Sequence, residues 1–141
     1  MTNKGPYSLL INKIYDRLSP KSHDIRLVLP ENNSRIAEAK QKLKELGFHI
    51  VELDNFKDYS DIFFEHSRKL KFAKNWPVEK LREYIQNPIN FGVNIVRSSL
   101  ADALIAGSNH PTSDIARSAL RFIGLNNKSN CLSSSFLMVS P

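Results

Sequence analysis

Two short β-rich apolar runs, separated by an amphipathic helical pattern, constrain the fold of this chain more than any other feature. The runs are residues 25–29, which end before Pro30, and residues 48–53. A strand, a helix and a second strand joined by short connections form a parallel β-sheet unit. The chain is therefore predicted to have an α/β fold. The apolar positions of the intervening helix recur at helical spacing: Ile36, Ala39, Leu43 and Leu46.

Both ends of this helix carry boundary signals. Asn32, Asn33 or Ser34 can accept a hydrogen bond from the first turn as an N-terminal cap. Gly47 lies where a residue in the left-handed conformation is expected to end the helix. These signals place the helix between the two predicted strands.

The rest of the chain continues the alternation of helices and strands. Proline residues mark several of the boundaries, because proline cannot continue a helix. Gly92 is expected to permit close approach of a neighbouring backbone. The predicted elements are an amphipathic helix ended by Pro20, helices over residues 57–73, 77–88 and 89–99, a strand buried on both faces over 101–107, a helix that reaches Gly124, and a last strand over 131–139.

The polar turn that follows Gly107 is the strongest candidate for a functional site. Ligands of open α/β sheets bind beyond the carboxyl ends of the strands, where the start of a helix presents unpaired N–H groups. Thr112 and Ser113 can cap the next helix or donate to phosphate oxygens, and Arg117 lies about one turn further along, within reach of an anion. Asp114 favours the positive helix end. The same spacing also fits a helix cap without a ligand.

Other reactive or charged positions favour a structural interpretation when they are considered alone. His110 could act as a general base, but no partner can be identified in the sequence, so a hydrogen-bonding or surface role is favoured. Cys131 opens an apolar run and is interpreted as a small core residue. Arg68 belongs to a basic run that is typical of a solvated helix end, and the other members of this run are Lys69, Lys71 and Lys74.

Charge and cysteine content narrow the class of protein. The chain has 20 Lys and Arg against 14 Asp and Glu, a formal charge of +6, which favours an anionic partner. Aromatic residues are not interleaved with basic ones, so nucleic acid is disfavoured. One cysteine excludes an intramolecular disulfide, and no Cys/His pair has zinc-ligand spacing, so we expect a cytoplasmic protein without metal or cofactor. The apolar runs are too short for a signal peptide or a membrane span.

The motifs resemble one enzyme family over much of the chain. NPINFGVNIVRSSLADALIAGSNHPTSDIARSALRFIGL, residues 87–125, and LSSSFLMVSP, residues 132–141, are similar to the central signature of the phosphate acetyltransferase and phosphate butyryltransferase family. IRLVLPENNSRIAEAKQKL, residues 25–43, resembles its first strand and helix, and SRKLK, residues 67–71, resembles its basic element. The resemblance implies a Rossmann-like three-layer α/β/α fold with a mainly parallel sheet.

The resemblance also implies a reaction and a set of residues. The reaction is the reversible transfer of an acetyl group between coenzyme A and phosphate, with acetyl-CoA and acetyl phosphate as substrates and no metal. By matching, Arg68 resembles an arginine that contacts CoA, and Arg117 resembles one that neutralises a substrate or CoA phosphate. The loop with His110, Thr112, Ser113 and Asp114 matches the loop at the active-site cleft.

The resemblance covers only the amino-terminal part of the family's domain. We expect residues 1–141 to represent an incomplete domain, with the catalytic base in a later segment that has no counterpart here. The chain is then a truncated transferase, a subunit that a second polypeptide completes, or a binding remnant for CoA or phosphate. Preference for acetyl or butyryl groups does not follow from these motifs.

We predict that the isolated chain self-associates or is poorly soluble. An incomplete sheet exposes an edge and apolar surface that a missing segment would cover. Size-exclusion chromatography at increasing concentration should show oligomers or aggregates. A single monomeric peak at high concentration would contradict this expectation.

Overall fold

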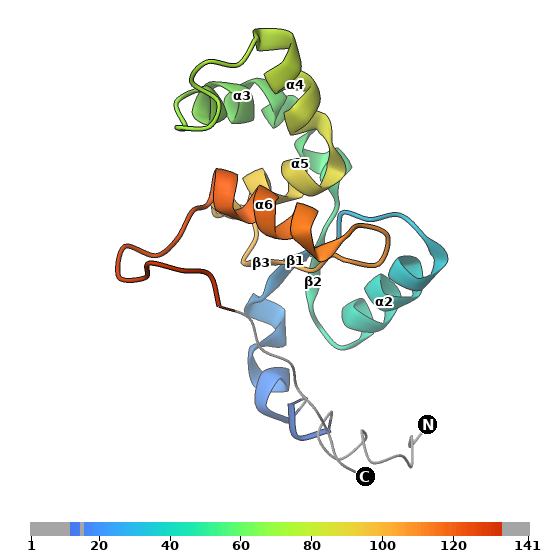
Figure 1. The fold of residues 1–141 in the computed structure, drawn as a ribbon. Coiled ribbons are helices and arrows are strands. Elements are labelled where there is room, and N and C mark those ends of the chain that lie inside the picture. The colour runs from blue at the N-terminus through green and yellow to red at the C-terminus, as the bar shows by residue number, and fades with distance from the viewer. Residues whose placement is uncertain (1–11, 15, 134–141) are drawn as a thin grey trace.

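A small parallel β-sheet lies at the centre of the fold (Figure 1). The computed structural model describes residues 12–14 and 16–133. The strands are β1 (Arg26–Val28), β2 (His49–Val51) and β3 (Ala103–Leu104), in the order β2-β1-β3. Both pairings are parallel, and Leu27 lies opposite Ile50 on one side and Ala103 on the other. The predicted α/β fold with a parallel sheet is confirmed, although β1 and β2 are shorter than the apolar runs that predicted them.

The crossover helix between the first two strands has the predicted boundaries. Helix α2 (Ser34–Glu45) begins after Asn33, whose side chain accepts a hydrogen bond from the Ile36 N–H at 2.9 Å. Gly47 has φ +88° and donates to the Lys44 carbonyl, while Phe48 donates to the Leu43 carbonyl. These two bonds form a Schellman motif, which glycine stabilises because it adopts positive φ without strain.

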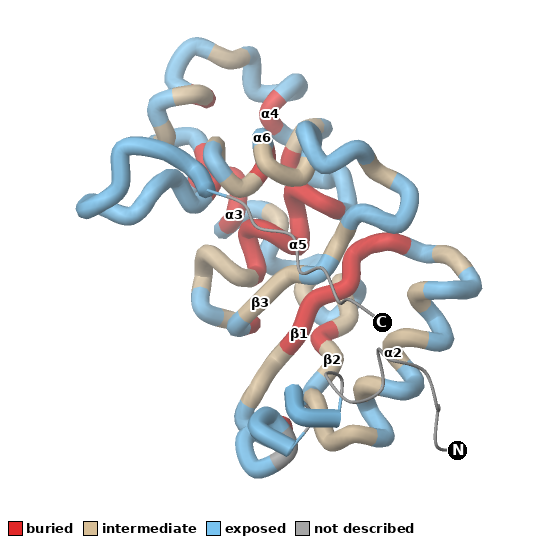
Figure 2. The backbone as a smooth tube through the Cα atoms, turned by 60° about the horizontal axis from the view of Figure 1, so that its bottom comes forward, coloured by how far each residue is buried: buried red, intermediate tan, exposed pale blue. Residues whose placement is uncertain are grey.

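Helix α5 (Pro88–Arg97) covers the sheet and is the most buried helix of the described chain. Its residues 89–95 are all buried, and Figure 2 shows the buried residues concentrated on α5 and β1. An added Cβ at Gly92 would lie 2.9 Å from Leu104 Cδ1 and 3.1 Å from Val28 Cγ1. Gly92 therefore permits a close approach, but its neighbours are side chains and not a backbone as predicted, and this approach lets α5 pack directly on β1 and β3.

The helix predicted over residues 57–73 is divided into three parts. A 3₁₀ segment, η2 (Leu53–Tyr59), precedes α3 (Ser60–Arg68), and residues 69–76 form turns. The turns are closed by hydrogen bonds from Leu70 N–H to the Ser67 carbonyl and from Ala73 N–H to the Leu70 carbonyl. They bury Ala73 and place the Phe72 ring against Phe122, with centroids 5.2 Å apart. Aromatic packing of this kind outweighs continuation of the helix.

The remaining helices follow the proline and glycine signals. Helix α4 (Val78–Gln86) begins after Pro77, and Pro88 starts α5 with Asn87 as its cap. Helix α6 (Thr112–Phe122) packs on α5 and is followed by Gly124, which has φ +83°. Residues 12–14 and 16–18 are α-helical, and the α-helix ends just before Pro20 as predicted. The chain continues as a 3₁₀ segment, η1 (Ser19–Asp24), with Pro20 in its first turn.

Two predictions near the carboxyl end of the chain are wrong. Strand β3 has two partly buried residues and, among the described strands, pairs with β1 alone, so residues 101–107 are not a strand buried on both faces. Ile105 is 46% exposed, although its N–H still donates to the Val28 carbonyl of β1 at 2.9 Å. Cys131 is exposed and residues 131–133 are not in a strand, so Cys131 is not a core residue. The rest of the strand predicted over 131–139 lies outside the described residues.

Among the helices that the structure describes, none combines the length and the apolar character needed to cross a bilayer.

We predict that Gly92→Ala destabilises the fold by about 1 kcal/mol or more, because overpacking of a core costs about 1–3 kcal/mol and exceeds the gain in helix propensity. Urea unfolding measures the change in the free energy of unfolding. Leu104→Ala removes the methyl group that the new Cβ meets. The double variant should therefore lose less stability than the sum of the two single variants, and strict additivity would contradict the proposed contact.

Candidate functional site

The candidate site is built where the chain leaves two neighbouring parallel strands. Glu31 follows the end of β1, and residues 107–110 follow the end of β3. Because parallel strands end at the same edge of a sheet, these two segments meet there. The location agrees with the predicted position of the site beyond the carboxyl ends of the strands.

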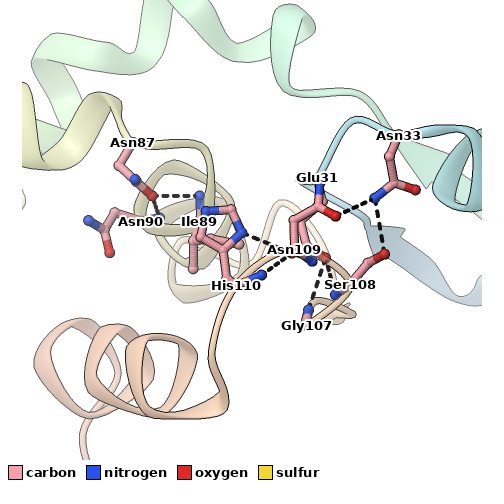
Figure 3. Close-up of polar contacts among 9 residues, drawn as sticks. All are labelled: Glu31, Asn33, Asn87, Ile89, Asn90, Gly107, Ser108, Asn109 and His110. Atoms are coloured by element: carbon pink, nitrogen blue, oxygen red, sulfur yellow. Dashed lines mark hydrogen bonds and ion pairs between the residues drawn. The ribbon is translucent and has the colours of Figure 1, made fainter.

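The buried carboxylate of Glu31 holds the whole turn after Gly107 (Figure 3). Its side chain is 0% exposed. Oε2 accepts from the backbone N–H groups of Gly107 at 2.9 Å and Ser108 at 2.8 Å, and Oε1 accepts from those of Asn109 at 2.8 Å and His110 at 3.1 Å. Four consecutive N–H groups thus surround one carboxylate, in the manner of an anion-binding nest.

Glu31 is ionised across the neutral pH range. Burial of the carboxyl group favours its protonated form, but hydrogen bonds from His110 and from the backbone of Asn109, Ser108 and Gly107 outweigh this effect and lower the pKa of Glu31 to about 2. A carboxylate with so low a pKa is a very weak base. Glu31 therefore acts as a fixed negative anchor for the turn.

His110 is oriented by the same carboxylate. Its Nδ1 lies 2.9 Å from Glu31 Oε1. We assign the proton to Nδ1, because an ionised carboxylate only accepts hydrogen bonds. In the neutral imidazole Nε2 is then the acceptor. This partner of His110 was not identifiable from the sequence. Glu31 could have been identified from its place after β1, because β1 pairs with β3 and His110 follows β3.

Asn33 joins helix α2 to the turn. The oxygen of its side chain caps α2, and its Nδ2 donates to Ser108 Oγ at 3.0 Å and to Asn109 Oδ1 at 3.1 Å (Figure 3). One amide therefore fixes both the crossover helix and the outer side of the turn. Sequence reasoning identified the capping role but not the contact with the turn.

A polar hollow of about 240 Å³ lies between the first turns of α5 and α6. It brings together three of the predicted site residues: His110, Asp114 and Arg117. Arg117 Nη1 donates to Asp114 Oδ1 at 2.8 Å on the exposed side of α6. The other residues that line the hollow are Tyr84, Asn87, Ile89, Asn90 and Arg121.

The remaining predicted residues lie around this hollow or away from it. Thr112 and Ser113 begin α6, but Pro111 occupies the N-cap position and no side chain caps the helix, so their predicted capping role is wrong. Ser113 lines a second, wider hollow of about 730 Å³ on the other side of Arg117. Arg68 is exposed at the end of α3 and lines neither hollow. Its contact with CoA stays a prediction.

Arg121 is a site residue that the sequence analysis missed. It lines both hollows, as Arg117 does, and its Nη1 donates to Tyr84 Oη at 2.9 Å. The signal was its spacing, since residues four apart on a helix lie on the same face.

Within the described part of the chain, no group of three or more His, Cys, Asp or Glu side chains is arranged to hold a metal ion.

Comparison with known families decides the assignment. A sequence model described as phosphate acetyl/butaryl transferase matches residues 17–141. The chain belongs to this family. The phosphate acetyltransferase of Thermoanaerobacterium thermosaccharolyticum is 30% identical over 118 residues, which are 82% of this chain and 35% of the relative. That of Acetivibrio thermocellus is 31% identical over 88 residues, which are 62% of this chain and 25% of the relative.

A solved structure supports the fold of this family member. The crystal structure of a phosphotransacetylase from Streptococcus pyogenes superposes with a TM-score of 0.59 at 24% identity, and the match covers 79% of this chain and 42% of that one. The matched part of the chain thus spans from 25% to 42% of the length of these three proteins.

We predict that Glu31→Gln lowers the free energy of unfolding at neutral pH by about 3 kcal/mol, because the amide leaves buried donors unpaired and the pKa shift of Glu31 corresponds to a stabilisation of that size. A lowered pKa stabilises the folded state above the usual value of 4.5, and this contribution is lost as the pH falls toward 2. Urea unfolding of both proteins at several pH values should therefore show a difference that narrows in acid. Glu83→Gln, on the exposed surface of α4, serves as the control, with a change below about 0.5 kcal/mol. A constant difference at all pH values would contradict the anchoring role of the Glu31 charge.

Proposed function

We propose that this chain forms the CoA- and phosphate-binding part of an acyltransferase that exchanges an acetyl group between coenzyme A and phosphate. The observation that carries the proposal is the polar hollow between α5 and α6, lined by His110 and Arg117, in a chain of the phosphate acetyl/butaryl transferase family. Acetyl-CoA with phosphate, or CoA with acetyl phosphate, would be the substrates.

Arg117 is the residue proposed to hold a phosphate group. Its ion pair with Asp114 is half-exposed, and ion pairs of this kind contribute little to stability. The guanidinium can therefore exchange this partner for a phosphate, which it binds in a bidentate manner. The hydroxyl groups of Thr112 and Ser113 lie in the same first turn of α6, where N–H groups and the positive end of the helix dipole favour an anion.

The proposed reaction is a direct displacement. The sulfur of CoA attacks the carbonyl carbon of acetyl phosphate, the new C–S bond forms, the C–O bond to phosphate breaks, and the phosphate leaves with the bonding electrons. The thiol proton passes to a base. Glu31 is unsuited to this task, because a carboxyl group with a pKa of about 2 and five hydrogen-bond donors around it accepts protons poorly.

A second candidate function is binding of CoA or another phosphorylated ligand without turnover. The observation that favours it is that Glu31, the carboxylate in contact with His110, is fully surrounded by donors. The arginine and histidine side chains at the hollow suit anion binding in either case.

We predict that Arg117→Ala weakens CoA binding about tenfold, because it removes one charge-assisted contact with a phosphate. Calorimetric titration with CoA measures the affinity, and thiol release from acetyl-CoA in the presence of phosphate measures turnover. Arg35→Ala, an exposed arginine on α2, is the matched control and should leave both unchanged. Turnover by the unaltered chain that is abolished in Arg117→Ala would support the transferase. Binding of CoA without turnover would support the second candidate. Equal CoA affinity of all three proteins would contradict the role of Arg117.

A further inference from the structure

Arg121 shares with Arg117 the boundary between two hollows. Helix α6 places the two residues one turn apart on one face. Both line the polar hollow of about 240 Å³ and the wider hollow of about 730 Å³. The guanidinium groups of Arg117 and Arg121 therefore both lie along the boundary between the two hollows.

The guanidinium of Arg121 is held in place by an aromatic cage. Its central carbon lies 5.4 Å from the ring centroid of Tyr84, 5.6 Å from that of Trp76 and 5.7 Å from that of Phe72. The rings pack on one another, with 5.2 Å between Trp76 and Tyr84 and 5.6 Å between Phe72 and Trp76. Nη1 also donates to Tyr84 Oη at 2.9 Å. The side chain is thus ordered before any ligand arrives, which reduces the entropy cost of binding.

The charge of Arg121 has no anionic partner among the described residues. Arg26, Arg82 and Arg117 each pair with an aspartate. Within the described part of the chain, Arg121 instead has three aromatic rings around it, one of which carries the Tyr84 hydroxyl, and it forms no salt bridge. A guanidinium carries five N–H donors, of which Tyr84 engages one. A half-buried cation that is fixed, uncompensated and beside two hollows is suited to bind an anion.

We propose that Arg121 is a second phosphate-binding residue, which acts beside Arg117 and is positioned by Tyr84. The inference rests on the proposed function for the identity of the ligand as CoA. The wall of the wider hollow is largely apolar, with Leu70, Phe72, Leu120 and Ile123. A ligand that fits this hollow therefore has an apolar or planar part as well as a phosphate. The group bound there is a phosphate attached to an apolar or planar moiety, such as the nucleotide end of CoA.

The first test observes Arg121 directly by NMR of the arginine side-chain Nε–H groups in the full chain. Inorganic phosphate and CoA are titrated separately, and the Arg121 signal is identified by its loss in Arg121→Gln. Arg82 is the internal control, since it lies against the Phe64 ring at 4.3 Å but pairs with Asp61 and lines neither hollow. A saturable shift of Arg121 that exceeds that of Arg82 is expected. No larger shift for Arg121 with either probe overturns the proposal.

The second test compares CoA affinities by calorimetry. Arg121→Gln should weaken CoA binding about tenfold, and Arg121→Lys should weaken it less, because lysine keeps the charge but loses the bidentate geometry. Tyr84→Phe keeps the ring and removes only the hydroxyl, so it should weaken binding a few-fold while the thermal midpoint stays close to that of the unaltered chain. Arg82→Gln should bind as the unaltered chain does. Dephospho-CoA, which lacks the 3′-phosphate, shows which phosphate is bound. If the unaltered chain still binds it about tenfold more tightly than Arg121→Gln does, Arg121 contacts the pyrophosphate. If the two proteins bind it equally, Arg121 contacts the 3′-phosphate.

The outcomes separate this inference from the proposed function. If CoA binding is weakened in Arg117→Ala but is as tight in Arg121→Gln as in the unaltered chain, the role of Arg121 is overturned and the proposed function stays intact. No CoA binding by the unaltered chain, together with a saturable Arg121 shift in inorganic phosphate, supports the anion site and contradicts CoA as its ligand.

Discussion

The arrangement of the candidate site depends on one buried carboxylate. Glu31 accepts four backbone hydrogen bonds from residues 107–110 and a fifth from His110. These bonds determine the path of the chain between β3 and α6, and so they determine where α6 starts and which way its arginine residues face. The positions of His110 and Arg117 at the hollow thus follow from a residue that does not line it. A buried charge without these donors would be strongly destabilising, so the turn and the carboxylate require each other.

Local signals in the sequence predicted the boundaries of helix α2 well. The cap at Asn33 and the Schellman motif at Gly47 each depend on one residue type and its neighbours, and both were recognisable without the structure. Close packing at Gly92 was also expected, although its neighbours are side chains and not the predicted backbone. The prediction of one helix over residues 57–73 was wrong, because some of its apolar residues pack against other elements instead of forming one helical face. Phe72 packs with rings from α4 and α6, and no helical periodicity reveals contacts between elements so far apart in the chain.

The candidate site was predicted in part. The turn after Gly107 and Arg117 were found, because helix starts beyond parallel strands bind anions and the motif resembles that of a known family. Glu31 and Arg121 were missed, because their roles come from tertiary contacts: a carboxylate 79 residues before His110 and an aromatic cage assembled from residues 72, 76 and 84. A cap role for Thr112 was expected from its residue type, but Pro111 occupies that position. Residue type shows what a side chain can do, and the tertiary fold determines which of these roles it takes.

The sequence separation of the Glu31 contacts also affects how the chain reaches its folded state. The donors lie 76 to 79 residues further along, so none of them is present beside β1 while the chain up to α5 collapses. Burial of Glu31 before residues 107–110 arrive would cost its hydration without compensation, and closing so long a loop is itself slow. Burial of Glu31 and docking of residues 107–110 are therefore coupled. During synthesis this edge of the sheet can close only after the segment with His110 has emerged from the ribosome.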